Sequence, residues 1–315
     1  MSILKKALAA AVVAGLVSTV GVVPANSAPK NQARSVAQPD WLEANLDNPK
    51  VRIIEVSTEP GIYERGHIKN AIKFVWHTDL VDTVNRDIIN AKNFSKLVQK
   101  AGISDDTTVV LYGDKNNWFA AWGAWIFNIY GQKDVRVLDG GRVKWEKDGR
   151  ALTTAVPTFS AGNFVATKAD KAIRATLIND VLPVAKKRVK ADLVDIRGAD
   201  EFNGKIFAAP GFQELSVRAG HIPGAVNVPW GANVNADGTF KTVAELKKLY
   251  ADKGIDGKQN IITYCRIGER SSLTWFVLSE ILGYNVKNYD GSWTEYGNSV
   301  GVPIVNNAGT IWGAA

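Results

Sequence analysis

Short apolar runs recur along the chain and alternate with stretches that have helical spacing of hydrophobic residues. The runs are rich in valine and isoleucine and cover residues 52–56, 108–112, 192–196 and 260–264. Such runs are typical of strands buried on both faces of a sheet. Helical patterns such as 244–254 (AELKKLYADKG) lie between them. Strands alternating with helices predict an α/β fold, with a mostly parallel sheet flanked by helices.

Four stretches of the chain occur twice in the same order. Residues 51–57 are similar to 191–197, 65–74 to 219–228, 107–113 to 260–265, and 135–149 to 286–298. A repeat period of about 150 residues is longer than the roughly 20–50 residues of solenoid units. The pattern therefore predicts two tandem domains, at 36–150 and 171–300. A linker at 151–170 joins them, and a tail at 301–315 follows.

The first 28 residues have the pattern of a signal peptide. Lys5 and Lys6 precede an uncharged run at 7–23, and the small residues of 24–28 (PANSA) follow. A membrane anchor is the alternative, but this run falls at the short end of the ~20 residues that a span needs. We therefore expect export to the periplasm or the extracellular space. After signal removal we expect no stable membrane insertion.

Composition and charge exclude several classes of partner. Without residues 1–28 the chain keeps 36 basic and 31 acidic residues, a net charge of +5. This suits small anionic substrates, but no basic run with interleaved aromatic residues indicates nucleic acid. The three histidines and one cysteine are not at ligand spacing, so we expect no metal site. We also expect no cofactor and a monomeric chain.

Cys265 is the only cysteine, and its position indicates a working thiol. Exported proteins usually pair their cysteines, so an odd one is either an intermolecular link or a reactive group. Cys265 directly follows the predicted strand 260–264, where ligands of a parallel sheet gather. A helical pattern begins near Ser271 and ends at Gly283. The intervening loop consists of Arg266, Ile267, Gly268, Glu269 and Arg270.

This loop is suited to covalent catalysis. A tight turn into a helix leaves backbone N–H groups free to point inward, and Gly268 permits the required backbone angle. These amides and the arginines Arg266 and Arg270 favour a thiolate and stabilise an anion attached to it. The alternative is an inert, buried cysteine that packs as a small hydrophobe. Reactive thiols are at least partly accessible, so we expect Cys265 to contact water.

The motifs resemble those of two-domain rhodaneses, the thiosulfate sulfurtransferases. Residues 265–270 (CRIGER) are similar to the active-site loop of the thiosulfate-using branch. Residues 286–296 (VKNYDGSWTEY) and 220–225 (GHIPGA) are similar to the family signatures. The resemblance implies that Cys265 is the nucleophile and carries a persulfide in a ping-pong cycle. It also implies that Arg270, helped by Arg266, binds a small anionic sulfur donor, and that cyanide or another thiophilic acceptor removes the sulfur. The backbone of Ile267, Gly268, Glu269 and Ser271 would complete the cradle.

Some positions depart from the family pattern or have structural interpretations. Glu201 stands where some members carry a substrate-binding arginine, and no second cation follows Arg270 in the loop. We interpret Asp195 and Arg197 as a structural ion pair near the site, and His67 and His221 as residues that stabilise turns. In the first copy Gly113 replaces the cysteine, so that domain is expected to lack catalysis. Trp118 and Phe119 either pack in the core or wall the site.

Rival functions differ in the loop. A cysteine-dependent phosphatase or arsenate reductase is a remote alternative. Dual-specificity phosphatases of the cell-cycle type have five residues between Cys and Arg, whereas here four separate Cys265 from Arg270. The smaller ring favours a sulfur atom over a phosphoryl group. A 3-mercaptopyruvate sulfurtransferase is a nearer alternative, although such enzymes tend to have uncharged loop residues. A non-enzymatic, exported sulfur carrier also remains open.

Overall fold

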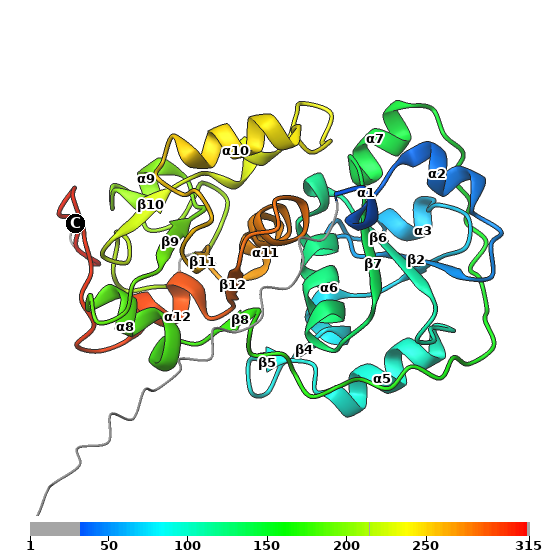
Figure 1. Ribbon diagram of the computed structural model, residues 1–315, viewed down its shortest axis with the longest axis horizontal. Helices are drawn as coiled ribbons and strands as arrows, with labels where there is room; N and C mark the ends of the chain where they lie inside the picture. The colour runs from blue at the N-terminus through cyan, green and yellow to red at the C-terminus, as the bar shows by residue number, and fades with distance from the viewer. Residues whose placement is uncertain (1–31, 214, 314–315) are drawn as a thin grey trace, which may run out of the picture.

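The chain forms two α/β domains in the computed structural model, which describes residues 32–213 and 215–313. Figure 1 shows the two domains side by side. The predicted signal peptide at 1–28 lies outside the described residues.

The N-terminal domain is built on a five-stranded parallel sheet of order β1-β7-β6-β2-β3. The strands are β1 (Val36–Ala37), β2 (Val51–Glu55), β3 (Ala71–Lys73), β6 (Thr108–Tyr112) and β7 (Asp134–Leu138). Side chains of α5 (Ala91–Lys100) and α6 (Trp118–Ile129) share a core cluster with one face of this sheet. Side chains of α2 (Pro39–Ala44), α3 (Ile62–Arg65) and α7 (Gly141–Lys147) share one with the other face. A short hairpin, β4 (Val81–Asp82) and β5 (Asp87–Ile88), follows α4 (Trp76–Asp79).

The C-terminal domain repeats this plan with a parallel sheet of order β10-β9-β11-β12-β8. The strands are β8 (Arg174–Ala175), β9 (Asp192–Asp195), β10 (Ala225–Asn227), β11 (Ile261–Tyr264) and β12 (Val286–Tyr289). Core clusters join α8 (Leu182–Ala185) and α12 (Ser292–Asn298) to one face, and α10 (Val243–Ala251) and α11 (Glu269–Phe276) to the other. The remaining helix, α9 (Ala199–Phe202), follows β9. The predicted fold class is therefore confirmed.

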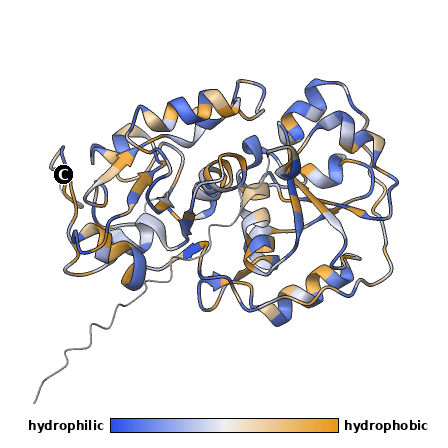
Figure 2. Ribbon diagram, in the orientation of Figure 1, coloured by the Kyte–Doolittle hydropathy of each residue, from blue (hydrophilic) through white to orange (hydrophobic). Residues whose placement is uncertain are grey.

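One hydrophobic core crosses the domain boundary. Helices α6 and α11 pack against each other, and their buried residues belong to a single cluster. Figure 2 shows hydrophobic residues along the strands of both sheets and on the helices between them. Since α11 begins at the predicted active-site loop, the N-terminal domain is held directly against that loop.

Helix α11 departs slightly from the sequence prediction. It begins at Glu269 rather than near Ser271, and its regular part ends at Phe276. A π-helical turn, Val277–Ile281, continues it toward Gly283. The earlier start shortens the loop and places Glu269 in the first helical turn.

The linker and the tail have equivalent structural roles. Residues 151–170 contain no helix, and Thr153 of this segment forms an isolated antiparallel bridge with His67. In the tail, Val305 forms the same kind of bridge with His221. The segment that follows each domain therefore pairs with a histidine of that domain, and the tail has this role in the C-terminal domain.

Within the described part of the chain, no helix combines the length and the apolar character needed to cross a bilayer.

Candidate active site

The cysteine loop is shaped by a glycine and by the turn after β12. Cys265 directly follows β11, and Gly268 has a φ of +100° at the N-terminus of α11. A Cβ at Gly268 would lie 2.4 Å from the carbonyl oxygen of Asp290, so a side chain is excluded by contact as well as by conformation. The loop and the β12–α12 turn are thus fitted to each other.

The sulfur of Cys265 accepts a hydrogen bond from the loop. The Gly268 N–H donates to Sγ at 3.1 Å. The Ser292 hydroxyl lies 4.0 Å from Sγ and donates at 2.7 Å to the carbonyl of Tyr289, while it accepts from the Cys265 N–H at 3.1 Å. The Tyr289 carbonyl is the nearer acceptor for the Ser292 hydroxyl, so the Gly268 amide at 3.1 Å is the main donor to the sulfur.

Ser292 adopts a backbone conformation that is unfavourable for serine. Its φ is +50°, and the first domain has Gly141, with a φ of +53°, at the matching position. A non-glycine residue in this region costs about 1–3 kcal/mol. The C-terminal domain therefore has a serine hydroxyl beside the thiol, although the backbone of this serine is strained.

The thiol does not contact water, contrary to the sequence expectation. The exposed fraction of Cys265 is 0%. The sequence predicts Cys265 at the open end of the sheet, but the residues that converge there from both domains are far apart in the chain. In this state a molecule from the solvent can reach Sγ only if part of this cover moves.

Aromatic rings hold the two loop arginines in place. The Arg270 guanidinium carbon lies 5.6 Å from the ring centre of Trp118 and 5.5 Å from that of Phe212. Arg266 lies 5.3 Å from the Phe212 ring centre and donates at 2.7 Å to the carbonyl of Gln213. Phe212 itself is 44% exposed. No pattern in the sequence indicates that Phe212 belongs to this site.

Trp118 and Phe119 have different roles. Trp118, the first residue of α6, packs edge-on against Trp230 at 4.6 Å and contacts Arg270. Phe119 is buried and packs on Trp76 in the core. The N-terminal domain thus contributes Trp118 to the wall of the site, whereas Phe119 is ordinary packing.

Two acidic side chains are buried at the site, one in the loop and one in the β12–α12 turn. Glu269 is 3% exposed, and its Oε2 has no hydrogen-bond partner in the structure. Burial raises the pKa of Glu269 to about 8, and the charge of Asp290 adds to that rise. Burial also raises the pKa of Asp290, while Arg86 and Arg174 oppose that shift. The sequence predicts a role only for the backbone of Glu269, and its buried carboxyl becomes evident only in the folded chain.

Asp195 and Arg197 form a closed ion pair one strand away from the loop. Arg197 Nη2 donates to Asp195 Oδ2 at 2.7 Å and to the carbonyl of Gly220 at 2.6 Å. Its guanidinium also lies 4.7 Å from the ring centre of Trp293. Arg197 is 1% exposed, so a substrate could not bind it without breaking these contacts.

The first domain builds the same pair from another element. Glu55 stands at the position of Asp195, but its partner is Arg142 of α7, at 3.1 Å. Arg142 also donates to the carbonyl of Gly66, the counterpart of Gly220. A buried pair that recurs in the domain without a cysteine fits a structural role.

The two histidines also occupy matching places. His67 stacks on Tyr63 and His221 on Phe202, with ring-centre distances of 3.8 and 3.7 Å. The Nδ1 atom of His67 lies 2.9 Å from the carbonyl of Tyr63, and that of His221 lies 2.7 Å from the carbonyl of Phe202. These contacts fit the predicted turn-stabilising role.

Gly113 shows why the first domain has no thiol. A Cβ at this position would lie 2.2 Å from the carbonyl oxygen of Val56. A cysteine could be accommodated only if the backbone moved.

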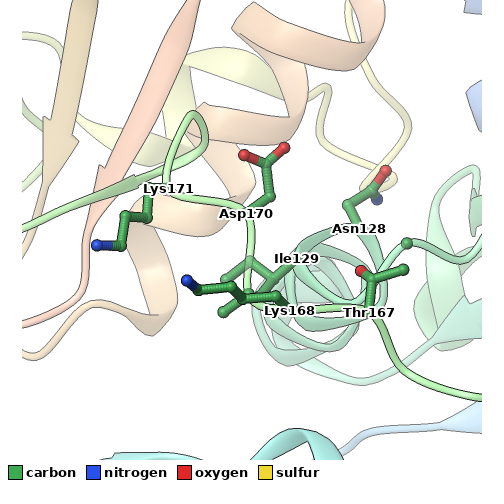
Figure 3. Close-up of a pocket in the computed structure, with 8 residues that line it drawn as sticks. Asn128, Ile129, Thr167, Lys168, Asp170 and Lys171 are labelled. Carbon is green, nitrogen blue, oxygen red and sulfur yellow. The ribbon is translucent and has the colours of Figure 1, made fainter.

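A separate hollow lies where the end of α6 meets the linker. Figure 3 shows its lining, which includes Asn128, Ile129, Thr167, Lys168, Asp170 and Lys171. Since it contains no residue of 265–270, it is not the candidate site. Across the described residues, no three histidine, cysteine, aspartate or glutamate side chains are grouped so that they could bind a metal ion.

The buried Glu269 carboxyl gives a stability prediction. With its pKa raised from 4.5 to about 8, the folded chain keeps a proton between these pH values that the unfolded chain has lost. The contribution of Glu269 to the free energy of unfolding therefore falls as pH rises through this window. Glu269→Gln removes this dependence. In urea unfolding we expect the free energy of unfolding of the variant, relative to that of the wild type, to rise between about pH 5 and 8.5. Between the two pKa values this rise is about 1.4 kcal/mol per pH unit. An equal difference at both pH values would contradict this protonation.

Comparison with known proteins identifies the family of the chain. The family model for the rhodanese-like domain matches twice, at residues 38–148 and 182–299. A Mycolicibacterium smegmatis protein named "Putative thiosulfate sulfurtransferase" is 52% identical over 267 residues, which are 84% of this chain and 95% of that protein. The Thermus thermophilus "Sulfur carrier protein TtuD" is 51% identical over 269 residues, 84% of this chain and 94% of that protein.

A solved structure shows the same architecture. The crystal structure of SseA from Escherichia coli, described under 3-mercaptopyruvate sulfotransferases, matches with a TM-score of 0.70 and 27% identity. The match covers 82% of this chain and 98% of that protein. The chain belongs to the rhodanese family and carries two tandem rhodanese-like domains.

Proposed function

We propose that the chain is a thiosulfate sulfurtransferase with Cys265 as its nucleophile. The observation that carries this proposal is the Gly268 N–H donated to Sγ at 3.1 Å, in a loop that also holds two arginines. An amide aimed at the sulfur stabilises both a thiolate and the anion of a persulfide. An inert buried cysteine would not need this arrangement.

The reaction has two balanced steps. The Cys265 thiolate attacks the outer sulfur of thiosulfate, an S–S bond forms to Sγ, and sulfite leaves with the electron pair of the broken bond. Cyanide, or another thiophilic acceptor, then attacks the outer sulfur of the persulfide. Thiocyanate leaves in the case of cyanide, and the Cys265 thiolate is restored. No external oxidant or reductant is required.

Arg270 and Arg266 are the proposed donor-binding groups. Within the described residues neither guanidinium forms an ion pair with a carboxylate, and both lie beside aromatic rings, which supports a role in binding an anionic donor. Because Cys265 is fully buried, donor binding must displace part of the cover, and the half-exposed Phe212 beside both arginines is the group we expect to move.

The location and partners of the chain are proposed from sequence alone. Residues 1–28 support export to the periplasm or the extracellular space. The mild positive charge supports small anionic donors.

Steady-state turnover separates the proposed enzyme from its alternatives. With excess thiosulfate and cyanide, we expect many molecules of thiocyanate per chain from the wild type. Cys265→Ser should keep the circular dichroism of the wild type and form no thiocyanate. A single burst per chain would instead indicate a sulfur carrier, and turnover with 3-mercaptopyruvate alone would indicate that donor.

The role of Arg270 predicts a change confined to the donor half-reaction. Arg270→Ala should lower kcat/KM for thiosulfate by about tenfold or more, which corresponds to about 1.4 kcal/mol of lost interaction with the anion. The kcat/KM for cyanide should change little. Arg188→Ala, at an exposed arginine, is the matched control. Equal losses for both substrates in Arg270→Ala would contradict a role in donor binding.

A further inference from the structure

One peptide group of the loop is bonded at both ends. The N–H of the Ile267–Gly268 peptide donates to Cys265 Sγ at 3.1 Å. The carbonyl of the same peptide accepts from Arg86 Nη2 at 2.7 Å. The peptide is planar, so an arginine that fixes its carbonyl also fixes the direction of its N–H. Hydrogen bonds in such a chain polarise one another, which strengthens the donation to sulfur.

The arginine belongs to the domain that lacks a cysteine. Arg86 lies in the turn between β4 and β5, and its φ is +52°. Left-handed backbone costs a non-glycine residue about 1–2 kcal/mol. The Nη1 atom of Arg86 lies 3.4 Å from Oδ1 of Asp290, a side chain that is 4% exposed. The hairpin thus reaches across the domain boundary to the back of the loop.

We propose that Arg86 is a positioning residue for sulfur transfer. It holds the Ile267–Gly268 peptide with its N–H toward Sγ and polarises that peptide for the anionic sulfur. The proposal rests on the proposed function in that Cys265 Sγ is taken as the reacting atom. It also gives the first domain a part in the reaction, beyond packing and the wall formed by Trp118.

Arg174 provides a matched control. Its Nη2 donates to Asp290 Oδ2 at 3.1 Å and also pairs with Asp87 of β5, so it stabilises the same domain boundary. Among the residues that the structure describes, Arg174 forms no hydrogen bond with a carbonyl of the loop. Arg86→Met and Arg174→Met therefore each remove one cation from Asp290, but only the first releases the Ile267 carbonyl.

Selective labelling makes this peptide directly observable. The dipeptide Ile-Gly occurs once in the sequence, at 267–268. A chain labelled with carbonyl-¹³C isoleucine and ¹⁵N glycine gives a single cross-peak in an amide-to-carbonyl NMR experiment. We expect Arg86→Met to move this peak upfield in both the carbonyl and the amide-proton dimensions, and Arg174→Met to leave it in place. An unmoved peak in Arg86→Met, or the same shift in both variants, would overturn the proposal.

Single-turnover kinetics give the functional readout. Removing an oxyanion-hole donor costs about 10²–10³ in rate, and loss of a group that only orients such a donor should cost less, about tenfold. We expect Arg86→Met to lower the limiting rate of persulfide formation by about this factor without weakening thiosulfate binding. Arg174→Met should stay within about twofold of the wild type. Equal slowing in both variants would assign the effect to domain docking and overturn the proposal.

The two proposals fail in different ways. If the wild type forms no persulfide from thiosulfate, the proposed donor is wrong, while the cross-peak still reports whether Arg86 orients the peptide. If the wild type forms the persulfide but the cross-peak does not move in Arg86→Met, only the positioning role is wrong.

Discussion

The hydrogen bond from the Gly268 amide to the sulfur of Cys265 is the interaction on which the proposed chemistry depends. It requires a left-handed glycine, because the Asp290 carbonyl occupies the space of any side chain. It requires the β12–α12 turn, where the Ser292 hydroxyl accepts a hydrogen bond from the Cys265 N–H. Ser292 itself has a strained backbone conformation. Through the Ile267 carbonyl, the same peptide is bonded to Arg86 of the other domain. Both domains thus shape the surroundings of a single sulfur atom.

The comparison of the two domains shows what was specialised for this purpose. Both contain a buried carboxylate–arginine pair, although the arginine comes from different elements. In each domain this arginine donates to the carbonyl of the glycine that precedes the stacked histidine. This shared frame is independent of the thiol. In the first domain the Val56 carbonyl occupies the space of any side chain at Gly113, and this domain contributes Trp118 and Arg86 to the site of the second.

Much of this could be predicted from local patterns. The valine- and isoleucine-rich runs predict the parallel strands, and the internal repeat predicts the two domains. The residues after 260–264 predict the cysteine loop. The contributions of Arg86 and Phe212 could not be predicted, because they depend on contacts between segments far apart in sequence. Arg86 lies 181 residues from Ile267, in a turn without periodic signal. The buried states of Cys265 and Glu269 escaped prediction for the same reason, since a loop at a helix start is normally solvated.

The most direct test of the central claim is the intact mass of the purified chain, measured after incubation with thiosulfate and again after cyanide. We expect that the wild type gains the mass of one sulfur atom, that cyanide removes it, and that Cys265→Ser gains none. A wild-type chain that gains no sulfur, or a serine variant that gains one, would contradict it.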